Sequence, residues 1–159
     1  MPTPDFVLRL REQVGTAPLP LVGVTAVVFP DENVPVGRRA DNGRPPCVSG
    51  IVDPGEQPAD SAVRECAEEA GVAVRVERLA FVQAMPRLTY ANGDQVDFVD
   101  LVFRCRWVSG DPHPADGELT EVGFRGLEEL GDMEQEQVRR IALAVAEDDP
   151  ARFEGGRPK

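Results

Sequence analysis

The chain has 159 residues, 42% of them hydrophobic, which fits one compact domain over residues 1–159 and argues against a two-domain organisation. Its formal net charge of −11 would repel a phosphate backbone, so we expect no stable nucleic-acid partner. Lys159 is the only lysine, which argues against a lysine Schiff base and against a Walker-type phosphate loop.

Cysteine usage and hydropathy indicate a cytoplasmic protein. The three cysteines, Cys47, Cys66 and Cys105, are odd in number and far apart, a pattern that favours neither a disulfide framework nor a zinc knuckle. No apolar run approaches the roughly 18 residues of a membrane span. Residues 1–10 also lack a basic region followed by an apolar stretch. We therefore expect no export and no membrane partner.

The first part of the chain predicts a helix and then a buried strand. Helical spacing of apolar residues over residues 6–14 indicates a short leading helix, within about residues 3–14. Residues 21–29 are rich in β-branched side chains and end at Pro30, which is typical of a buried strand. Residues 31–46, rich in Gly, Pro, Asp and Arg, are expected to form a loop.

The second half predicts three more strands and a last helix. Residues 72–82 and 96–108 read as strands joined in a hairpin, and Asn92-Gly93-Asp94 supplies turn chemistry between them. Residues 122–124 suggest a further short strand, and about residues 134–147 a C-terminal helix. Helices at the start, middle and end of a set of strands predict an α/β fold whose sheet is covered on both faces.

An acidic helix is predicted over residues 58–70. Pro58 suits a first helical turn, and Gly71 suits the left-handed position that ends a helix. At about 100° per residue, a stripe of small apolar residues is expected to face the sheet, with three glutamates on the opposite side. The apolar stripe is Ala59, Ala62, Val63, Cys66 and Ala70, and the acids are Glu65, Glu68 and Glu69.

The spacing of these glutamates points to a bound cation. Carboxylates at i, i+3 and i+4 repel one another, and Arg64, which can reach Glu68, cannot balance all of them together with Glu56. An all-oxygen ligand set favours Mg²⁺, with Mn²⁺ as the substitute. A metal held in this way supports hydrolysis of a phosphoanhydride. The competing interpretation is that the glutamates form an ordinary solvated helix face.

Residues 50–72 resemble the Nudix box. That pattern is Gly, five residues, Glu, seven residues, Arg-Glu, an apolar residue, any residue, Glu-Glu, any residue, Gly and an apolar residue. Cys66 and Val72 occupy the apolar places. The fixed places are all matched, by Gly50, Glu56, Arg64, Glu65, Glu68, Glu69 and Gly71. Seven fixed residues over 23 positions make a specific match.

The resemblance implies a Nudix-type α/β/α sandwich with a mixed β-sheet, and it also implies roles for site residues. The metal ligands would be Glu65, Glu68 and Glu69, joined by the carbonyl of Gly50. Glu56 and Arg64 would orient them. Family members often use a later glutamate as ligand or general base, and Glu118 is the candidate, with Glu121 as its competitor. Both could instead be ordinary surface charges.

The function implied is Mg²⁺-dependent hydrolysis of a pyrophosphate bond in a small-molecule nucleotide. The substrate would be ADP-ribose or another nucleotide sugar, or a (deoxy)nucleoside triphosphate, and no local motif chooses between these classes. One alternative is a catalytically silent nucleotide-sensing module on the same fold. Another, an RNA-end hydrolase, is disfavoured by the acidic charge. The resemblance also implies a homodimer.

Three weaker signals have competing interpretations. Residues 34–39 resemble a family strand that ends in arginine, so Arg38 or Arg39 could meet substrate phosphate or could form a solvated pair. Pro35 should then lie at a strand edge or bulge. His113 could act as a base, although a surface-loop position is the simpler assignment. Cys66 is expected to be a small buried hydrophobe, not a nucleophile.

Overall fold

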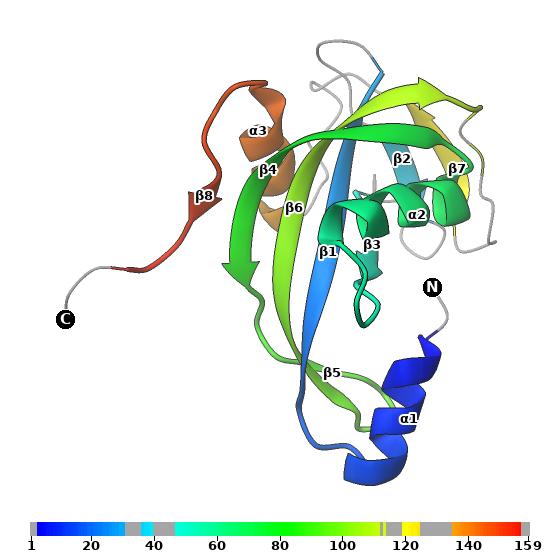
Figure 1. Cartoon of the computed structure of the whole chain (residues 1–159), viewed down its shortest axis with the longest axis vertical. Helices are drawn as coiled ribbons and strands as arrows, with labels where there is room; N and C mark the ends of the chain where they lie inside the picture. The colour runs from blue at the N-terminus through cyan, green and yellow to red at the C-terminus, as the bar shows by residue number, and fades with distance from the viewer. Residues whose placement is uncertain are drawn as a thin grey trace.

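A mixed β-sheet forms the centre of the computed structural model, which describes residues 3–30, 36–39, 47–111, 113, 119–124 and 135–156 (Figure 1). For residues 36–39 and 119–124 only the backbone is described. The six-stranded sheet has the order β3 (Val48–Ile51), β1 (Leu19–Phe29), β6 (Gln95–Ser109), β4 (Ala73–Ala84) and β8 (Arg152–Phe153), and β5 (Leu88–Thr89) pairs with β6. A separate two-stranded sheet joins β2 (Val36–Arg39) to β7 (Leu119–Phe124). The helices are α1 (Asp5–Val14), α2 (Pro58–Ala70) and α3 (Gln135–Val145).

Strand direction varies across the larger sheet. The central pair, β1 and β6, is parallel and in register from Leu19 opposite Val96 to Phe29 opposite Arg106. The predicted antiparallel pairing of β4 with β6 is confirmed, but the turn at residues 92–94 joins β6 to the short strand β5. The edge strand β3 is antiparallel to β1. The sheet is therefore mixed, as the resemblance implied.

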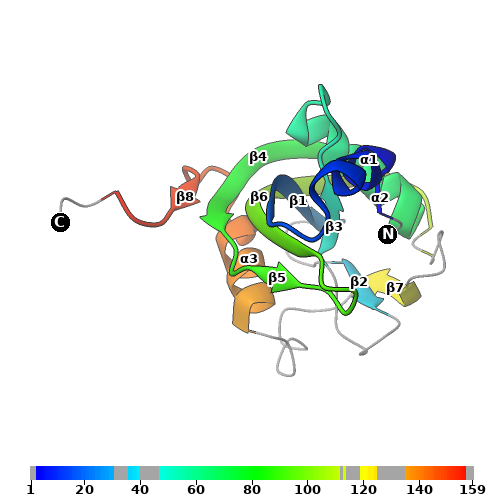
Figure 2. The ribbon, with the colours of Figure 1, turned by 90° about the horizontal axis from the view of Figure 1, so that it is seen from below.

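The two faces of the sheet are covered by different helices. Val24, Ala26 and Val28 of β1 pack with the buried side of α2. Val27 and Phe29, which alternate with them, pack with α3. Figure 2 shows α2 and α3 on opposite sides of the curved sheet. The α/β/α layering predicted from the sequence is confirmed, with α1 packed through Val7 near the start of β1.

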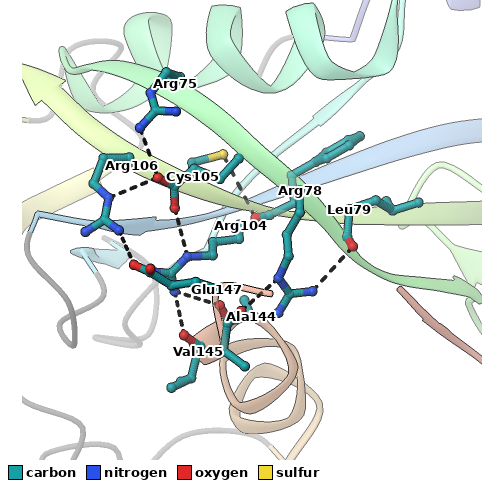
Figure 3. A network of polar contacts seen from close by, with 12 residues as sticks. Arg75, Arg78, Leu79, Arg104, Cys105, Arg106, Ala144, Val145 and Glu147 are labelled. Carbon is teal, nitrogen blue, oxygen red and sulfur yellow. Dashed lines mark hydrogen bonds and ion pairs between the residues drawn. The ribbon is translucent and has the colours of Figure 1, made fainter. Parts of the chain in front are cut away.

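Arginines hold the end of α3 on the sheet. Arg104 is fully buried, and its guanidinium donates to the carbonyls of Ala144 at 2.9 Å and Val145 at 2.7 Å (Figure 3). Arg78 donates to the carbonyls of Leu143 and Ala146, both at 2.7 Å. Glu77 balances the buried charge at 2.9 Å from Arg104. The last carbonyls of the helix, which have no partner within the helix, are thereby satisfied.

The structure differs from the predicted elements in a few places. Within the expected loop at residues 31–46, residues 36–39 form the strand β2, in agreement with the family strand that residues 34–39 resemble, and β2 pairs with β7 through two register shifts. Pro35 itself lies outside the described residues. The strand β3 and the two-residue strands β5 and β8 were not among the predicted elements. Among the described residues, no helix is long and apolar enough to cross a membrane.

Candidate functional site

The helix α2 has the predicted ends, and they fix where its glutamates lie. Pro58 occupies the first helical position, and Gly71 ends the helix with φ +66°. The amides of Gly71 and Val72 donate back to the carbonyls of Ala67 and Cys66, each at 3.2 Å. This left-handed glycine closure places Glu68 and Glu69 in the last turn, immediately before the helix ends.

The apolar side of α2 packs on the sheet as predicted. Ala62, Cys66 and Ala70 are buried in the core cluster that includes β1 and β6. Burial raises the pKa of the Cys66 thiol well above its usual value. A thiol that stays protonated in an apolar core is not a nucleophile. The interpretation of Cys66 as a small buried hydrophobe is confirmed.

The competing interpretation, an ordinary solvated helix face, is wrong for Glu65, which also does not lie on one exposed side with Glu68. Glu65 is 2% exposed, whereas Glu68 is 58% exposed and Glu69 is half-buried. The carboxylate of Glu65 lies against Gly50 of β3, so closely that a Cβ at Gly50 would be 2.1 Å from Cδ of Glu65. The physical reason is that α2 contacts β3 as well as the sheet centre. A helical projection does not reveal this second contact.

Arg64 holds three carboxylates together. Its guanidinium makes two hydrogen bonds to Glu56, at 2.9 and 3.0 Å. It donates to Glu65 at 2.7 Å and, as predicted, to Glu68 at 3.2 Å. Another hydrogen bond of 3.2 Å reaches the carbonyl of Ile51 at the end of β3. Arg64 therefore ties the helix, the turn before it and the edge strand into one arrangement.

Sequence reasoning missed Ser61. Its hydroxyl is fully buried, accepts a hydrogen bond from Arg64 at 3.0 Å and donates to the Ile51 carbonyl at 3.4 Å. The available signal was its position one helical turn before Glu65, on the same edge of α2. Ser61 thus marks the side of the helix that faces β3.

The acids of the site have different electrostatic environments. Hydrogen bonds from Arg64 lower the pKa of Glu56 to about 2 and raise the pKa of Arg64 itself. Burial raises the pKa of Glu65, and it outweighs the opposing effect of Arg64. Glu65 is therefore a carboxylate whose ionised form needs more positive charge than Arg64 supplies.

This environment fits a hard divalent cation. Oε2 of Glu65 is buried and has no hydrogen-bond donor among the described residues. Leaving a buried carboxylate oxygen without a partner is costly. In the described part of the chain, no three acidic, histidine or cysteine side chains are grouped closely enough to enclose a metal by themselves. Mg²⁺ does not require such a cage, because it takes one or two carboxylates and keeps waters or substrate phosphates.

The remaining candidate residues are described only in part. Glu118 lies outside the described residues. The backbone of Glu121 in β7 pairs with that of Arg38 in β2, and Arg39 pairs with Leu119. The side chains of these four residues are not described, so the choice between Glu118 and Glu121 and the phosphate role of Arg38 or Arg39 stay predictions. His113 is exposed and lies against the end of α2.

Comparison with known proteins gives consistent matches. A family model described as the NUDIX domain matches residues 19–145. A MutT-like protein of Streptomyces ambofaciens is 31% identical over 122 residues, which are 76% of this chain and 73% of that protein. An ADP-ribose pyrophosphatase structure from Streptococcus suis has a TM-score of 0.67 at 20% identity, over 86% of this chain and 100% of that one. A UDP-X diphosphatase structure has a TM-score of 0.65 at 19% identity, over 94% and 73% respectively. At these low identities the two structures support the fold alone.

Proposed function

The chain belongs to the Nudix hydrolase family, and from that premise we propose that it uses Mg²⁺ to hydrolyse a phosphoanhydride bond in a small-molecule nucleotide. The observation that carries the proposal is the buried carboxylate of Glu65, which has one oxygen without a donor among the described residues. Glu68 and Glu69 follow on the next turn of the same helix. A nucleotide diphosphate carries the charge that a Mg²⁺ ion at this place would offset.

The residues of the box would have two roles: some would bind the ion, and others would orient its ligands. Glu65, Glu68, Glu69 and the carbonyl of Gly50 are the proposed ligands of Mg²⁺, with one or two of the carboxylates bound directly and the rest through its waters. When bound, Mg²⁺ neutralises diphosphate charge and lowers the pKa of a coordinated water. Arg64 keeps the carboxylates in place through its hydrogen bonds to Glu56, Glu65 and Glu68. We retain Glu118 as the proposed general base or further ligand.

Two substrate classes follow from the proposal. One is ADP-ribose or a nucleotide sugar, in agreement with the names of the two structural neighbours. The other is a (deoxy)nucleoside triphosphate. A panel of ADP-ribose, UDP-glucose and dGTP with Mg²⁺ separates them by product. The first two would release a nucleoside monophosphate and a sugar phosphate, and dGTP would release dGMP and pyrophosphate.

A catalytically silent nucleotide-sensing module is the alternative. Against it stands the complete set of box carboxylates, Glu56, Glu65, Glu68 and Glu69. Nucleotide binding by wild-type protein without turnover of any panel member would favour the sensing module. Turnover that Glu69→Gln abolishes would favour the enzyme.

We also propose a cytoplasmic homodimer without a stable nucleic-acid partner. The net charge of −11 supports the last point, because the protein would repel a phosphate backbone. The homodimer rests on family resemblance. Size-exclusion chromatography with light scattering tests it, and a monomer mass across the micromolar range would contradict it.

A further inference from the structure

The chain that leaves β6 crosses the end of the catalytic helix. Gly110, at φ +98°, lies so close to this end that a Cβ on it would be 2.6 Å from the carbonyl oxygen of Gly71. The indole N–H of Trp107 donates to the Gly110 carbonyl at 3.0 Å. Two glycine backbones are thus packed together, and a core-facing tryptophan fixes one of them.

His113 continues this contact with both its backbone and its ring. Its backbone N–H donates to the carbonyl of Ala70, the last residue of α2, at 3.0 Å. Its imidazole lies over Gly71, where a Cβ would be 2.2 Å from Cε1 of the ring. Nδ1 is 2.8 Å from the carbonyl oxygen of Asp111. The ring therefore occupies the space that the glycine leaves free.

This contact acts at the carboxyl end of α2, where the amides of Gly71 and Val72 pair with the carbonyls of Ala67 and Cys66 and His113 pairs with that of Ala70. The last carbonyls of a helix have no partner inside it, and the final turn frays most readily. The last turn of α2 contains no basic residue that could cap it. It does contain Glu68 and Glu69, which the proposed function needs in a fixed orientation. His113 supplies a hydrogen-bond donor to the carbonyl of Ala70 and a ring that packs against Gly71.

We propose that His113 is a positioning residue for the reaction. It holds the last turn of α2 in place, and through that turn it orients Glu68 and Glu69. The inference rests on the proposed function for its catalytic consequence but not for its structural part. The role is mechanical, because the ring fills the space beside Gly71 while its Nδ1 is paired with the Asp111 carbonyl.

Two variants distinguish this positioning role from a role in proton transfer or hydrogen bonding. His113→Ala removes the ring but keeps the backbone N–H, and His113→Phe keeps a flat ring that cannot exchange protons. In His113→Ala, we expect amide hydrogen exchange to become faster in residues 66–72 and to stay unchanged in residues 135–145, the internal control. We expect kcat to fall about ten- to hundredfold with KM within about twofold, because small misplacement of reacting groups is costly. In His113→Phe, both kcat and the slow amide exchange of residues 66–72 should be close to those of the wild type.

Amide exchange and kcat test the structural and the catalytic parts of the proposal independently. Unchanged exchange in residues 66–72 of His113→Ala would overturn the proposal whatever the activity. Faster exchange with wild-type kcat would overturn its catalytic part. Equal loss of kcat in His113→Phe and His113→Ala would show that proton transfer or hydrogen bonding matters, which also contradicts the proposal. If wild-type protein hydrolyses no nucleotide, the proposed function fails, and the exchange measurement still decides whether His113 holds the helix end.

Discussion

Gly50 and Glu65 fit together as one unit at the edge of the sheet. The carboxylate of Glu65 fills the space where a side chain at position 50 would begin. Because the helix and the strand approach so closely, the amino acid at position 50 controls where the carboxylate lies. The fixed glycine of the box therefore has a steric reason in this chain, in addition to the proposed use of its carbonyl.

Replacing Gly50 with alanine should disturb both stability and activity. A Cβ 2.1 Å from Cδ of Glu65 must displace the carboxylate. Such overpacking typically costs about 1–3 kcal/mol. Urea unfolding and kcat measurements test this. Gly23→Ala is the matched control in the neighbouring strand β1, where the added Cβ would make an ordinary 3.4 Å contact with Phe98. Equal behaviour of the two variants would rule out the steric role.

The ion pair between Glu56 and Arg64 should make stability depend on pH in the acid range. The pKa of Glu56 is lowered from 4.5 to about 2 in the folded protein. Below about pH 4.5 the unfolded chain takes up a proton that the folded chain does not. The stabilisation is therefore complete above this pH and is lost as pH falls towards 2. Glu56→Gln should show a smaller fall in the free energy of unfolding over this window. Parallel curves for variant and wild type would contradict the assignment.

At the scale of elements, α2 was the most predictable part of the chain. Pro58 and Gly71 act through their own backbone chemistry, so they set the ends of the helix without help from the rest of the fold. Runs rich in β-branched and apolar residues likewise located β1, β4 and β6. The contact of Arg64 with Glu68 followed from helical spacing alone.

Features that depend on contacts between distant segments were not predictable. The burial of Glu65 and Ser61 arises from β3, which no helical projection contains. Family resemblance indicated the strand β2, but not its pairing with β7, more than 70 residues later in the chain. The two-residue strands β5 and β8 have too little sequence to carry a period of their own. The contact of His113 with Gly71 was not predictable either, because it also joins two distant segments.

The attachment of α3 to the sheet should depend on one buried arginine. Arg104→Ala removes the donors to the carbonyls of Ala144 and Val145, while Glu77 keeps Arg75 and Arg106 as partners. Leaving a buried carbonyl without a donor typically costs about 1–3 kcal/mol for each group. Arg75→Ala is the control, because Arg75 also pairs with Glu77, at 3.1 Å, but is 67% exposed. Its expected cost is below about 1 kcal/mol. Equal losses in urea unfolding would contradict this account of α3.

At the scale of the whole molecule, the α/β class and the covered sheet could be predicted, but the strand order could not. Hydrophobic periodicity locates strands without saying which ones are neighbours. The parallel pairing of β1 with β6 places segments 77 residues apart side by side, from Leu19 opposite Val96 to Phe29 opposite Arg106. This arrangement puts α2 on one face of the sheet, where β3 reaches its edge (Figure 1).

Mg²⁺ should stabilise the folded protein through the acids of α2. A ligand that binds only the folded state adds about 2.7 kcal/mol at one hundred times its Kd. We expect Tm to rise with MgCl₂ in the wild type and to rise much less in Glu68→Gln/Glu69→Gln. NaCl at equal ionic strength is the control, since screening of the net charge of −11 also affects stability. An equal rise in both proteins would place the bound ion elsewhere.

The most direct measurement compares Mg²⁺-dependent kcat/KM of wild type and Glu68→Gln/Glu69→Gln on the panel substrate with the highest turnover. Loss of metal stabilisation is worth several kcal/mol, so we predict a fall of at least about a hundredfold. Glu12→Gln, on the exposed side of α1, should keep wild-type turnover. Hydrolysis at the wild-type rate by the double variant would contradict the central claim that the acids of α2 hold the catalytic ion.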